Sequence, residues 1–122
     1  MTLYRYKATV TRVVDGDTLD LLIFLGFDIH VNRRVRLFGV DTPEVYGVTK
    51  ESEEYRKGKL ASEFTTQWLA AVNNEVQIQT FKDKQGKYGR YIAVVRNLND
   101  ENATSLNEDL VSNGHAVEVF YG

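Results

Sequence analysis

Several acidic and basic side chains in this sequence have the types and spacing that suit hydrolysis of a phosphodiester. Arg36, Asp41 and Glu44 fall within nine residues of one another. Asp17 follows an Asp-Gly turn dipeptide, and Arg90 ends a basic turn. Carboxylates bind hard divalent cations, and a planar guanidinium can hold two phosphate oxygens. A cation and two arginines would stabilise the charge on a five-coordinate phosphorus, while Glu44 orients or deprotonates the attacking water.

The stretch from Asp41 to Glu44 also has a second interpretation. Asp41 or Thr42 would cap a helix that has Pro43 at its first position and Glu44 in its first turn. On this stretch alone, a helix start and an active site explain the residues equally well. Two other places in the chain favour the active site: Asp17, after the Asp-Gly turn, and Arg90, after the basic turn.

Composition limits the kind of metal and the kind of partner. The chain has 122 residues, enough for one domain, which we expect to span 1–122. It has no cysteine and only two histidines, so any metal should be a hard cation on oxygen ligands, for which calcium is plausible. The net charge is −2, so nucleic acid would have to meet a local basic patch.

No stretch of the sequence predicts a membrane partner. The longest apolar run, 21–25, is too short to span a bilayer, and residues 1–7 lack an apolar signal region. We therefore expect a chain that either stays inside its cell or has lost a leader, with the cytoplasm slightly favoured.

Alternating apolar and polar residues predict strands that would bring the chemical residues together. Arg36 lies on the polar parity of a strand that Pro43 ends, and Asp17 opens the return strand of a hairpin. If the second and third strands are neighbours, Asp17 and Asp41 could share one cation. Arg12 interrupts the apolar face of the first strand, as happens where a barrel strand bends. The expected strands are 4–14, 18–25, 29–40, 75–81, 91–95 and 116–120.

Two helices complete the predicted architecture. Residues 59–72 have helical periodicity, and their apolar stripe is expected to face the core. The stripe consists of Leu60, Phe64, Trp68 and Ala71, widened by Ala61, Leu69 and Val72. Residues 45–58 show no such period and are expected to form a loop.

A capping box predicts the second, shorter helix. Ser105 is followed by Glu108, and Gly114 is suited to end the helix. Taken together, the pattern predicts a fold that is mainly β with helices (α+β), a five-stranded OB-fold Greek-key barrel with one long and one short helix.

Four motifs along the chain carry a family resemblance. They begin at Val14, Arg36, Tyr88 and Leu106, and they read Val-Asp-Gly-Asp-Thr, Arg-Leu-x-Gly-Val-Asp-Thr-Pro-Glu, Tyr-Gly-Arg and Leu-Asn-Glu-x-Leu-Val-x-x-Gly-x-Ala. In this order they resemble the staphylococcal nuclease (thermonuclease) family over nearly the whole chain. The resemblance implies an OB-fold, calcium-dependent endonuclease that cuts DNA and RNA to leave 3′-phosphate ends.

The resemblance also implies roles for single residues. It implies that Asp17 and Asp41 bind calcium by their side chains and Thr42 by its carbonyl. The implied catalytic residues are Arg36, Glu44 and Arg90, and the implied nucleotide-binding residues are Lys87 and Tyr88.

The chain departs from the family pattern in a few places. Gly86 stands where the family commonly has an acidic residue, and the loop after Glu44 differs in sequence. The chain also ends at Gly122, where the secreted enzyme continues. Its ending, Gly-His-Ala followed by an aromatic-Gly tail, resembles that of the compact members encoded by phages and prophages.

Two other functions were weighed against a nuclease. A non-catalytic OB module could bind single-stranded nucleic acid on aromatic and basic side chains, and a purely structural domain could bind a protein partner. A binder has no use for Asp17, Asp41 and Glu44 near an anion, because uncompensated carboxylates repel phosphate. We therefore expect a monomeric enzyme acting on DNA and RNA, preferably single-stranded, and we interpret Lys82 and Lys84 as solvated turn charges.

Overall fold

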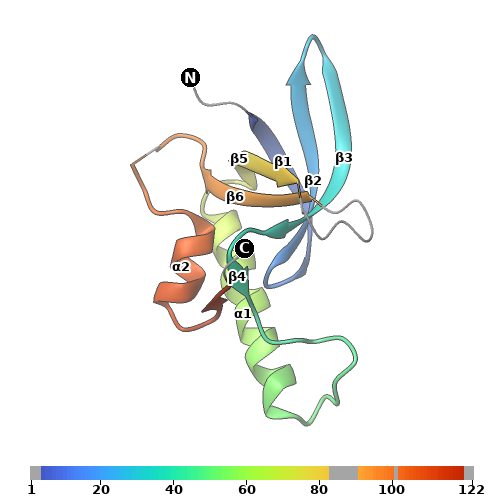
Figure 1. Cartoon of the computed structure of the whole chain (residues 1–122), viewed down its shortest axis with the longest axis vertical. Helices are drawn as coiled ribbons and strands as arrows, with labels where there is room; N and C mark the ends of the chain where they lie inside the picture. The colour runs from blue at the N-terminus through green and yellow to red at the C-terminus, as the bar shows by residue number, and fades with distance from the viewer. Residues whose placement is uncertain (1–3, 83–90, 101, 120–122) are drawn as a thin grey trace.

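The computed structural model of the chain describes residues 4–82, 91–100 and 102–119. Five strands form a closed barrel in the order β1-β2-β3-β6-β5, and two helices pack against it (Figure 1). This architecture confirms the predicted fold class of a five-stranded OB-type barrel with one long and one short helix. The barrel strands are β1 (Arg5–Asp15), β2 (Thr18–Gly26), β3 (Ile29–Leu37), β5 (Glu75–Lys82) and β6 (Tyr91–Asn97).

Strand register places the chemical residues on adjacent strands. β1, β2 and β3 pair as consecutive antiparallel neighbours, and β3 closes the barrel by pairing in parallel with β6. Thr18, next to Asp17, lies opposite Arg36. The predicted adjacency of the second and third strands is therefore confirmed. The register of β1 shifts on both sides of Arg12 and Val13, which is the bend that Arg12 predicted.

The third strand and the last strand are shorter than the sequence pattern predicted. β3 ends at Leu37, and Gly39 has a φ of +74°, a left-handed conformation that breaks the strand. The chain then forms β4 (Val40–Asp41), which pairs outside the barrel with β7 (Val117–Glu118). The predicted continuous strands 29–40 and 116–120 are therefore wrong in extent. Residues 40–41 and 117–118 instead pair with each other in a small second sheet beside the site.

The long helix begins earlier than predicted. α1 (Glu53–Ala70) starts after Ser52, whose hydroxyl accepts a hydrogen bond from the Tyr55 N–H at 3.1 Å. The part of the expected loop from residue 53 to residue 58 is thus helical. Its turns are mostly solvent-exposed, so they carry no apolar period that the sequence could reveal.

The face of α1 that packs on the barrel matches the predicted stripe only in part, since Ala61 and Leu69 are buried as predicted. Its buried residues are Gly58, Ala61, Thr65 and Leu69, whereas Leu60 is 45% exposed. Phe64 and Trp68 flank this face and are only partly buried. The helix presents small residues to the barrel, so it approaches the β1–β2 turn closely. The predicted place of Leu60 in the core is therefore wrong.

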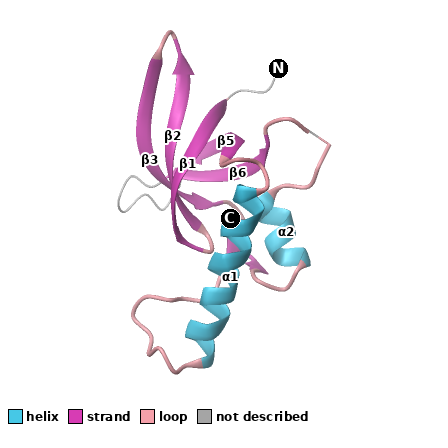
Figure 2. Cartoon of the chain, turned by 180° about the vertical axis from the view of Figure 1, so that it is seen from behind, coloured by secondary structure: helices cyan, strands magenta, loops and turns pink. Residues whose placement is uncertain are grey.

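The short helix matches its sequence signature. α2 (Leu106–Ser112) opens with a complete capping box, in which Ser105 and Glu108 each bond the other's backbone N–H. Figure 2 shows α1 and α2 on the same side of the barrel. The Trp68 ring N–H of α1 donates to the Asp109 carboxylate of α2 at 2.8 Å, which joins the two helices.

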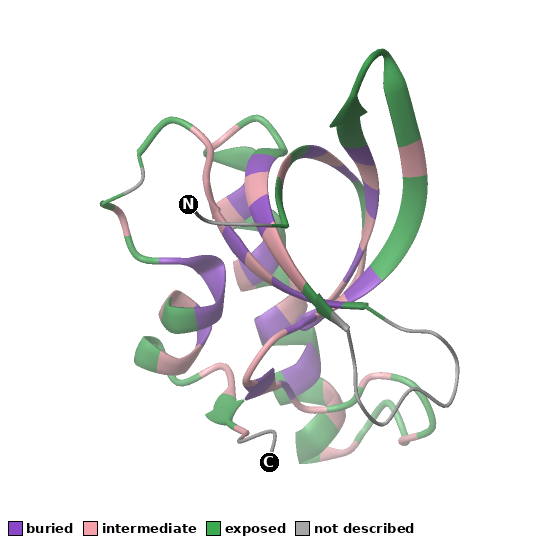
Figure 3. Cartoon of the chain, turned by 45° about the horizontal axis from the view of Figure 1, so that its top comes forward, coloured by how far each residue is buried: buried purple, intermediate pink, exposed green. Residues whose placement is uncertain are grey.

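Burial follows this arrangement. The buried residues line the inside of the barrel and the faces of the helices turned toward it (Figure 3). The β2–β3 hairpin extends beyond the barrel and is exposed toward its tip (Figures 1 and 3). In the described part of the chain, neither helix combines the length and apolar character needed to cross a membrane.

Two leucines on α1 provide a test of this packing. Leu69→Ala should lower the free energy of unfolding by about 2–5 kcal/mol, because Leu69 is fully buried and its truncation leaves a cavity. Leu60→Ala should change it by no more than about 0.5–1 kcal/mol, because that side chain is largely in solvent. Denaturant unfolding of both variants measures the difference. Equal losses would show that the helix is turned as the sequence stripe predicted.

Candidate active site beside the β1–β2 turn

Asp17 sits in the turn between β1 and β2, pressed against α1. It is only 6% exposed. The preceding Gly16 is packed so tightly that a Cβ there would lie 2.9 Å from the Ala61 Cβ and 3.0 Å from the Thr42 side chain. The Thr65 hydroxyl donates to the Gly16 carbonyl at 2.8 Å, which anchors the turn to the helix. The Asp-Gly-Asp turn is thus a fixed element of the site.

The Asp17 carboxylate links two segments that are distant in sequence. Its Oδ2 accepts the backbone N–H of Thr42 at 3.2 Å, and its Oδ1 accepts the Thr18 hydroxyl at 3.2 Å. Thr42 is itself buried. The two segments predicted to carry the site therefore meet through this carboxylate.

Burial makes the ionised form of Asp17 costly. Burial, followed by the hydrogen bond and negative charge of Asp15, raises the pKa of Asp17 to about 6. The Thr42 N–H and the charge of Arg36 act in the opposite direction and lower this pKa. Asp17 is thus a buried acid whose pKa stays above its ordinary value, because the Thr42 N–H and Arg36 only partly offset burial and the charge of Asp15.

Arg36 contacts both aspartates. One terminal nitrogen of its guanidinium lies 3.0 Å from Asp41 Oδ1 and 3.6 Å from Asp17 Oδ2. The Arg36 side chain is about one third exposed, so it is neither in the core nor fully solvated. The structure therefore brings Arg36, Asp17 and Asp41 together, and it places Thr42 next to them.

Glu44 lies on an exposed loop beside this group. Residues 42–52 are not helical, and the helix begins only at Glu53. The interpretation of Asp41–Glu44 as a helix start is therefore wrong. Asp41 and Glu44 both line a groove that we call the acidic groove. Its lining is Asp41, Thr42, Pro43, Glu44, Glu53, Glu54, Lys57, Gly114, His115, Ala116 and Val117.

A glycine of α1 sets the position of Glu44. A Cβ built on Gly58 would lie 2.7 Å from the Pro43 carbonyl oxygen, 2.8 Å from the Val45 side chain and 2.9 Å from the Glu44 carbonyl oxygen. Because the neighbours are mainly backbone, they cannot rotate away from an added methyl group. The helix and the 43–45 segment can approach this closely only with glycine at position 58.

The donor set fits a hard cation better than a soft one. Asp17 and Asp41 offer carboxylate oxygens and Thr42 offers a carbonyl, and these oxygen donors suit Ca²⁺. Within residues 4–82, 91–100 and 102–119, no three acidic or histidine side chains converge as a metal cluster.

Three predicted site residues cannot be placed. Arg90, Lys87 and Tyr88 lie outside the described residues, as do Lys84 and Gly86. β6 begins directly after Arg90, at Tyr91, which pairs with Val35 on β3.

Sequence reasoning missed the residues that support the site. Gly58 and Thr65 were not singled out, and Asn107 appeared only within the Leu-Asn-Glu motif without a role, although each contacts the backbone of a site segment or of the strands beside it. An isolated glycine inside a helix is unfavourable in itself and is a usable signal of close packing. Thr65 gave no such signal, and the motif that contains Asn107 did not reveal its role, because their partners are remote in sequence.

By its fold and site, this protein is an OB-type barrel that carries an arginine-bridged pair of aspartates beside an exposed glutamate. Comparison with known proteins gives the family. Residues 34–122 match the family model described as staphylococcal nuclease homologue, and the chain belongs to this family. It is 39% identical over 112 residues to Thermonuclease of Staphylococcus intermedius, covering 92% of this chain and 59% of that protein.

Two further relatives are more distant. Endonuclease YhcR of Bacillus subtilis (strain 168) is 30% identical over 118 residues, which cover 94% of this chain and 9% of that protein. Uncharacterized protein MJ1439 of Methanocaldococcus jannaschii is 30% identical over 128 residues, which cover 91% of this chain and 58% of that protein. The chain therefore spans less than two thirds of the length of each of these relatives.

Gly58→Ala tests the close contact behind Glu44. In an ordinary helix this change stabilises the protein by roughly 0.5–1 kcal/mol. Here we expect the opposite sign, a loss of about 1–3 kcal/mol, because the methyl group overlaps backbone atoms. Denaturant unfolding measures the change, with the neighbouring, exposed Lys59→Ala as control. A stabilised Gly58→Ala variant would show that the 43–45 segment does not depend on this contact.

Proposed function

We propose that this chain is a calcium-dependent endonuclease that hydrolyses phosphodiester bonds of DNA and RNA, preferably single-stranded, and leaves 3′-phosphate ends. The observation that carries the proposal is the contact of one Arg36 nitrogen with both Asp17 and Asp41, next to an exposed Glu44. This arrangement combines a cation-binding pair, a phosphate-binding fork and a base. We expect the chain to act as a monomer.

The two aspartates and Thr42 are the residues that would hold the calcium ion. A bound divalent cation supplies counter-charge to the carboxylates and polarises the phosphate. Asp17 is held ready for this role, because its carboxylate is fixed by the Thr42 N–H and the Thr18 hydroxyl. Its burial also favours a positive partner, because an ionised carboxylate out of water is costly unless it is compensated.

The arginines would stabilise the charge that develops on the phosphate. Arg36 is held by Asp41 at the end of β3, so its donors are positioned before substrate binds. We assign Arg90 as the second donor. Its successor Tyr91 pairs with Val35, the residue before Arg36, which supports this assignment. Lys87 and Tyr88 would hold the terminal phosphate of the bound nucleotide.

Glu44 would act on the attacking water. It accepts a proton from the water or orients it, and the water oxygen forms a bond to phosphorus. The bond from phosphorus to the 5′-oxygen of the following nucleotide breaks, and that oxygen takes up a proton. The products are then a 3′-phosphate and a 5′-hydroxyl end. The exposure of Glu44 at the acidic groove leaves room for water beside it.

A non-catalytic binding module is the alternative function, and calcium dependence separates the two. Denatured DNA and RNA should be cut in calcium, duplex DNA should be cut more slowly, and a chelator should abolish cleavage. Magnesium should support the reaction poorly, because Mg²⁺ demands tighter geometry and retains its water. End-labelled oligonucleotides resolved on gels measure both the rate and the 3′-phosphate end. Binding without cleavage under all metal conditions would favour the binding module.

Glu44→Gln tests the assigned base. The rate on denatured DNA should fall by about a hundredfold or more, because the amide cannot accept the proton. Thermal melting should change little, since Glu44 is exposed. The matched control is Glu54→Gln, which removes the same charge from the same groove. Equal rate losses in the two variants would indicate a general charge effect and would remove Glu44 from the mechanism.

A further inference from the structure

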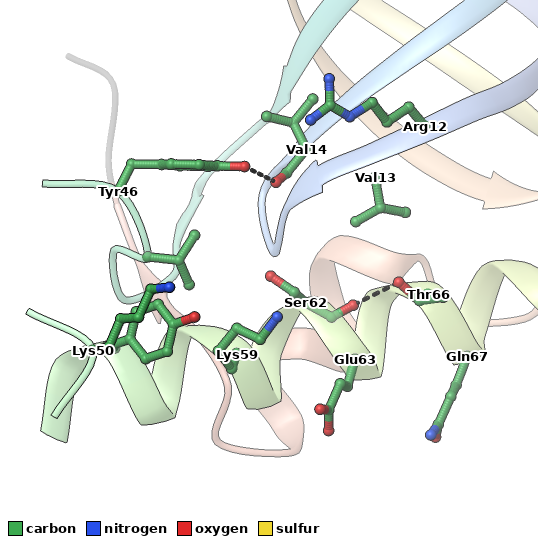
Figure 4. A pocket seen from close by; sticks show the side chains of 12 residues that line it. Arg12, Val13, Val14, Tyr46, Lys50, Lys59, Ser62, Glu63, Thr66 and Gln67 are labelled. Atoms are coloured by element: carbon green, nitrogen blue, oxygen red, sulfur yellow. Dashed lines mark hydrogen bonds between the residues drawn. The ribbon is translucent and has the colours of Figure 1, made fainter. Parts of the chain in front are cut away.

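A second groove lies on the other side of the segment that follows Glu44. It has a volume of about 580 Å³ and runs between the end of β1 and the outer side of α1 (Figure 4). We call it the basic groove. Its lining includes Arg12, Tyr46, Lys50, Tyr55, Lys59 and Glu63.

Three cations meet in this groove although the whole chain has a net negative charge. Arg12, Lys50 and Lys59 are exposed and come from a strand, a loop and a helix. Among the ion pairs of the described residues, none involves these three side chains within 4 Å. The acid in the lining, Glu63, points away from Tyr46 and Arg12 in Figure 4. The groove thus offers positive charge to an external anion.

Aromatic side chains accompany these charges. Tyr46 is 59% exposed, yet its hydroxyl donates to the Val14 carbonyl at 3.3 Å, which fixes the ring across the groove (Figure 4). Tyr55 is a second aromatic in the lining. Fixed aromatic rings next to basic side chains are suited to unpaired bases and their phosphates, because the bases of a duplex are already stacked on each other.

The basic groove and the candidate active site are built on the same two segments of the chain. The segment 41–46 carries Asp41 and Glu44 and then Tyr46, and the β1–β2 turn carries Asp17 shortly after Val14. The Asp17–Thr42 and Tyr46–Val14 hydrogen bonds join the same two segments. A strand held at the acidic groove could therefore pass over this junction into the basic groove.

We infer that the basic groove binds the single-stranded nucleic acid that flanks the cleaved phosphate, with Arg12, Lys50 and Lys59 on phosphates and Tyr46 stacked on a base. This inference rests on the proposed function, whose site it extends. It predicts that affinity rises with strand length beyond the nucleotides next to the cleaved bond. Because the contacts are to the backbone and to base faces, the affinity should rise with length equally for DNA and for RNA.

The test measures binding in a chelator, where cleavage is expected to be absent. Fluorescence anisotropy gives the affinity of the whole chain for oligothymidylates of three and twelve nucleotides. The double variant Arg12→Glu/Lys59→Glu should bind the 12-mer at least about tenfold more weakly and lower the salt slope by roughly 1.4, or about 0.7 per lost contact. The preference for the 12-mer over the trimer should largely disappear. Twelve-residue oligouridylate should show the same loss.

Two controls separate this groove from general charge and from misfolding. Arg5→Glu/Arg33→Glu makes the same change in net charge at exposed residues outside the groove, and it should lower 12-mer affinity by less than about threefold. Tyr46→Ala should weaken 12-mer binding by about fivefold or more through lost stacking, whereas Tyr46→Phe should retain it. Melting temperatures of all variants verify that they are folded.

The outcomes distinguish the groove from the proposed function. If the wild-type chain cleaves in calcium and the Arg12/Lys59 variant keeps the full preference for the 12-mer, the inference about the basic groove is wrong and the proposed function stands. If the wild-type chain never cleaves but the variant loses this preference, the inference about the basic groove is supported and the proposed function is wrong. Polyglutamate serves as a competitor of the 12-mer. If it competes as well as nucleic acid does, and equally well in the Tyr46→Ala variant, the assignment of the ligand as nucleic acid is wrong.

Discussion

The buried carboxylate of Asp17 is the constraint on which the arrangement of the site depends. A carboxylate with so little exposure is unfavourable unless hydrogen bonds and positive charge compensate it. The Thr42 N–H, the Thr18 hydroxyl and the Arg36 guanidinium provide that compensation from three parts of the chain. The turn, the end of β3 and the following loop are therefore tied together, since displacing any one would leave the charge less satisfied.

The two helices hold this junction in place from outside the barrel. α1 presents Gly58, Ala61 and Thr65 to the site segments, so close approach replaces the bulky packing of an ordinary core helix. From α2, the Asn107 amide donates to the Phe38 and Ala93 carbonyls and accepts the Val95 N–H. These bonds fix the chain where it leaves β3, between Arg36 and Asp41, which form an ion pair. Functional groups on the loop thus gain the rigidity of the helices and strands.

The same junction also separates two regions of opposite charge. The acidic groove contains Asp41 and Glu44, and the basic groove begins at Tyr46 on the other side of the loop. An enzyme for polyanions needs carboxylates to hold metal and activate water, but these carboxylates repel the substrate. Positive charge gathered next to the site offsets that repulsion without changing the net charge of the chain. In the proposed function, this division would let a chain of net charge −2 accept a polyanionic substrate.

The sequence alone determined the barrel, the pairing of the second and third strands and the capping box at Ser105, because each depends on local periodicity or on a local hydrogen bond. It also identified Asp17, Arg36 and Asp41 as partners. Only the tertiary structure decided that Gly58 and Thr65 rather than Leu60 face the barrel, because the contact face is made largely of small residues. It also decided where α1 begins, because the first turns of that helix are solvated. It also decided that β3 stops at Leu37 and that Glu44 lies in a loop. Those features depend on backbone atoms brought together from remote parts of the chain, which no periodicity in the sequence records.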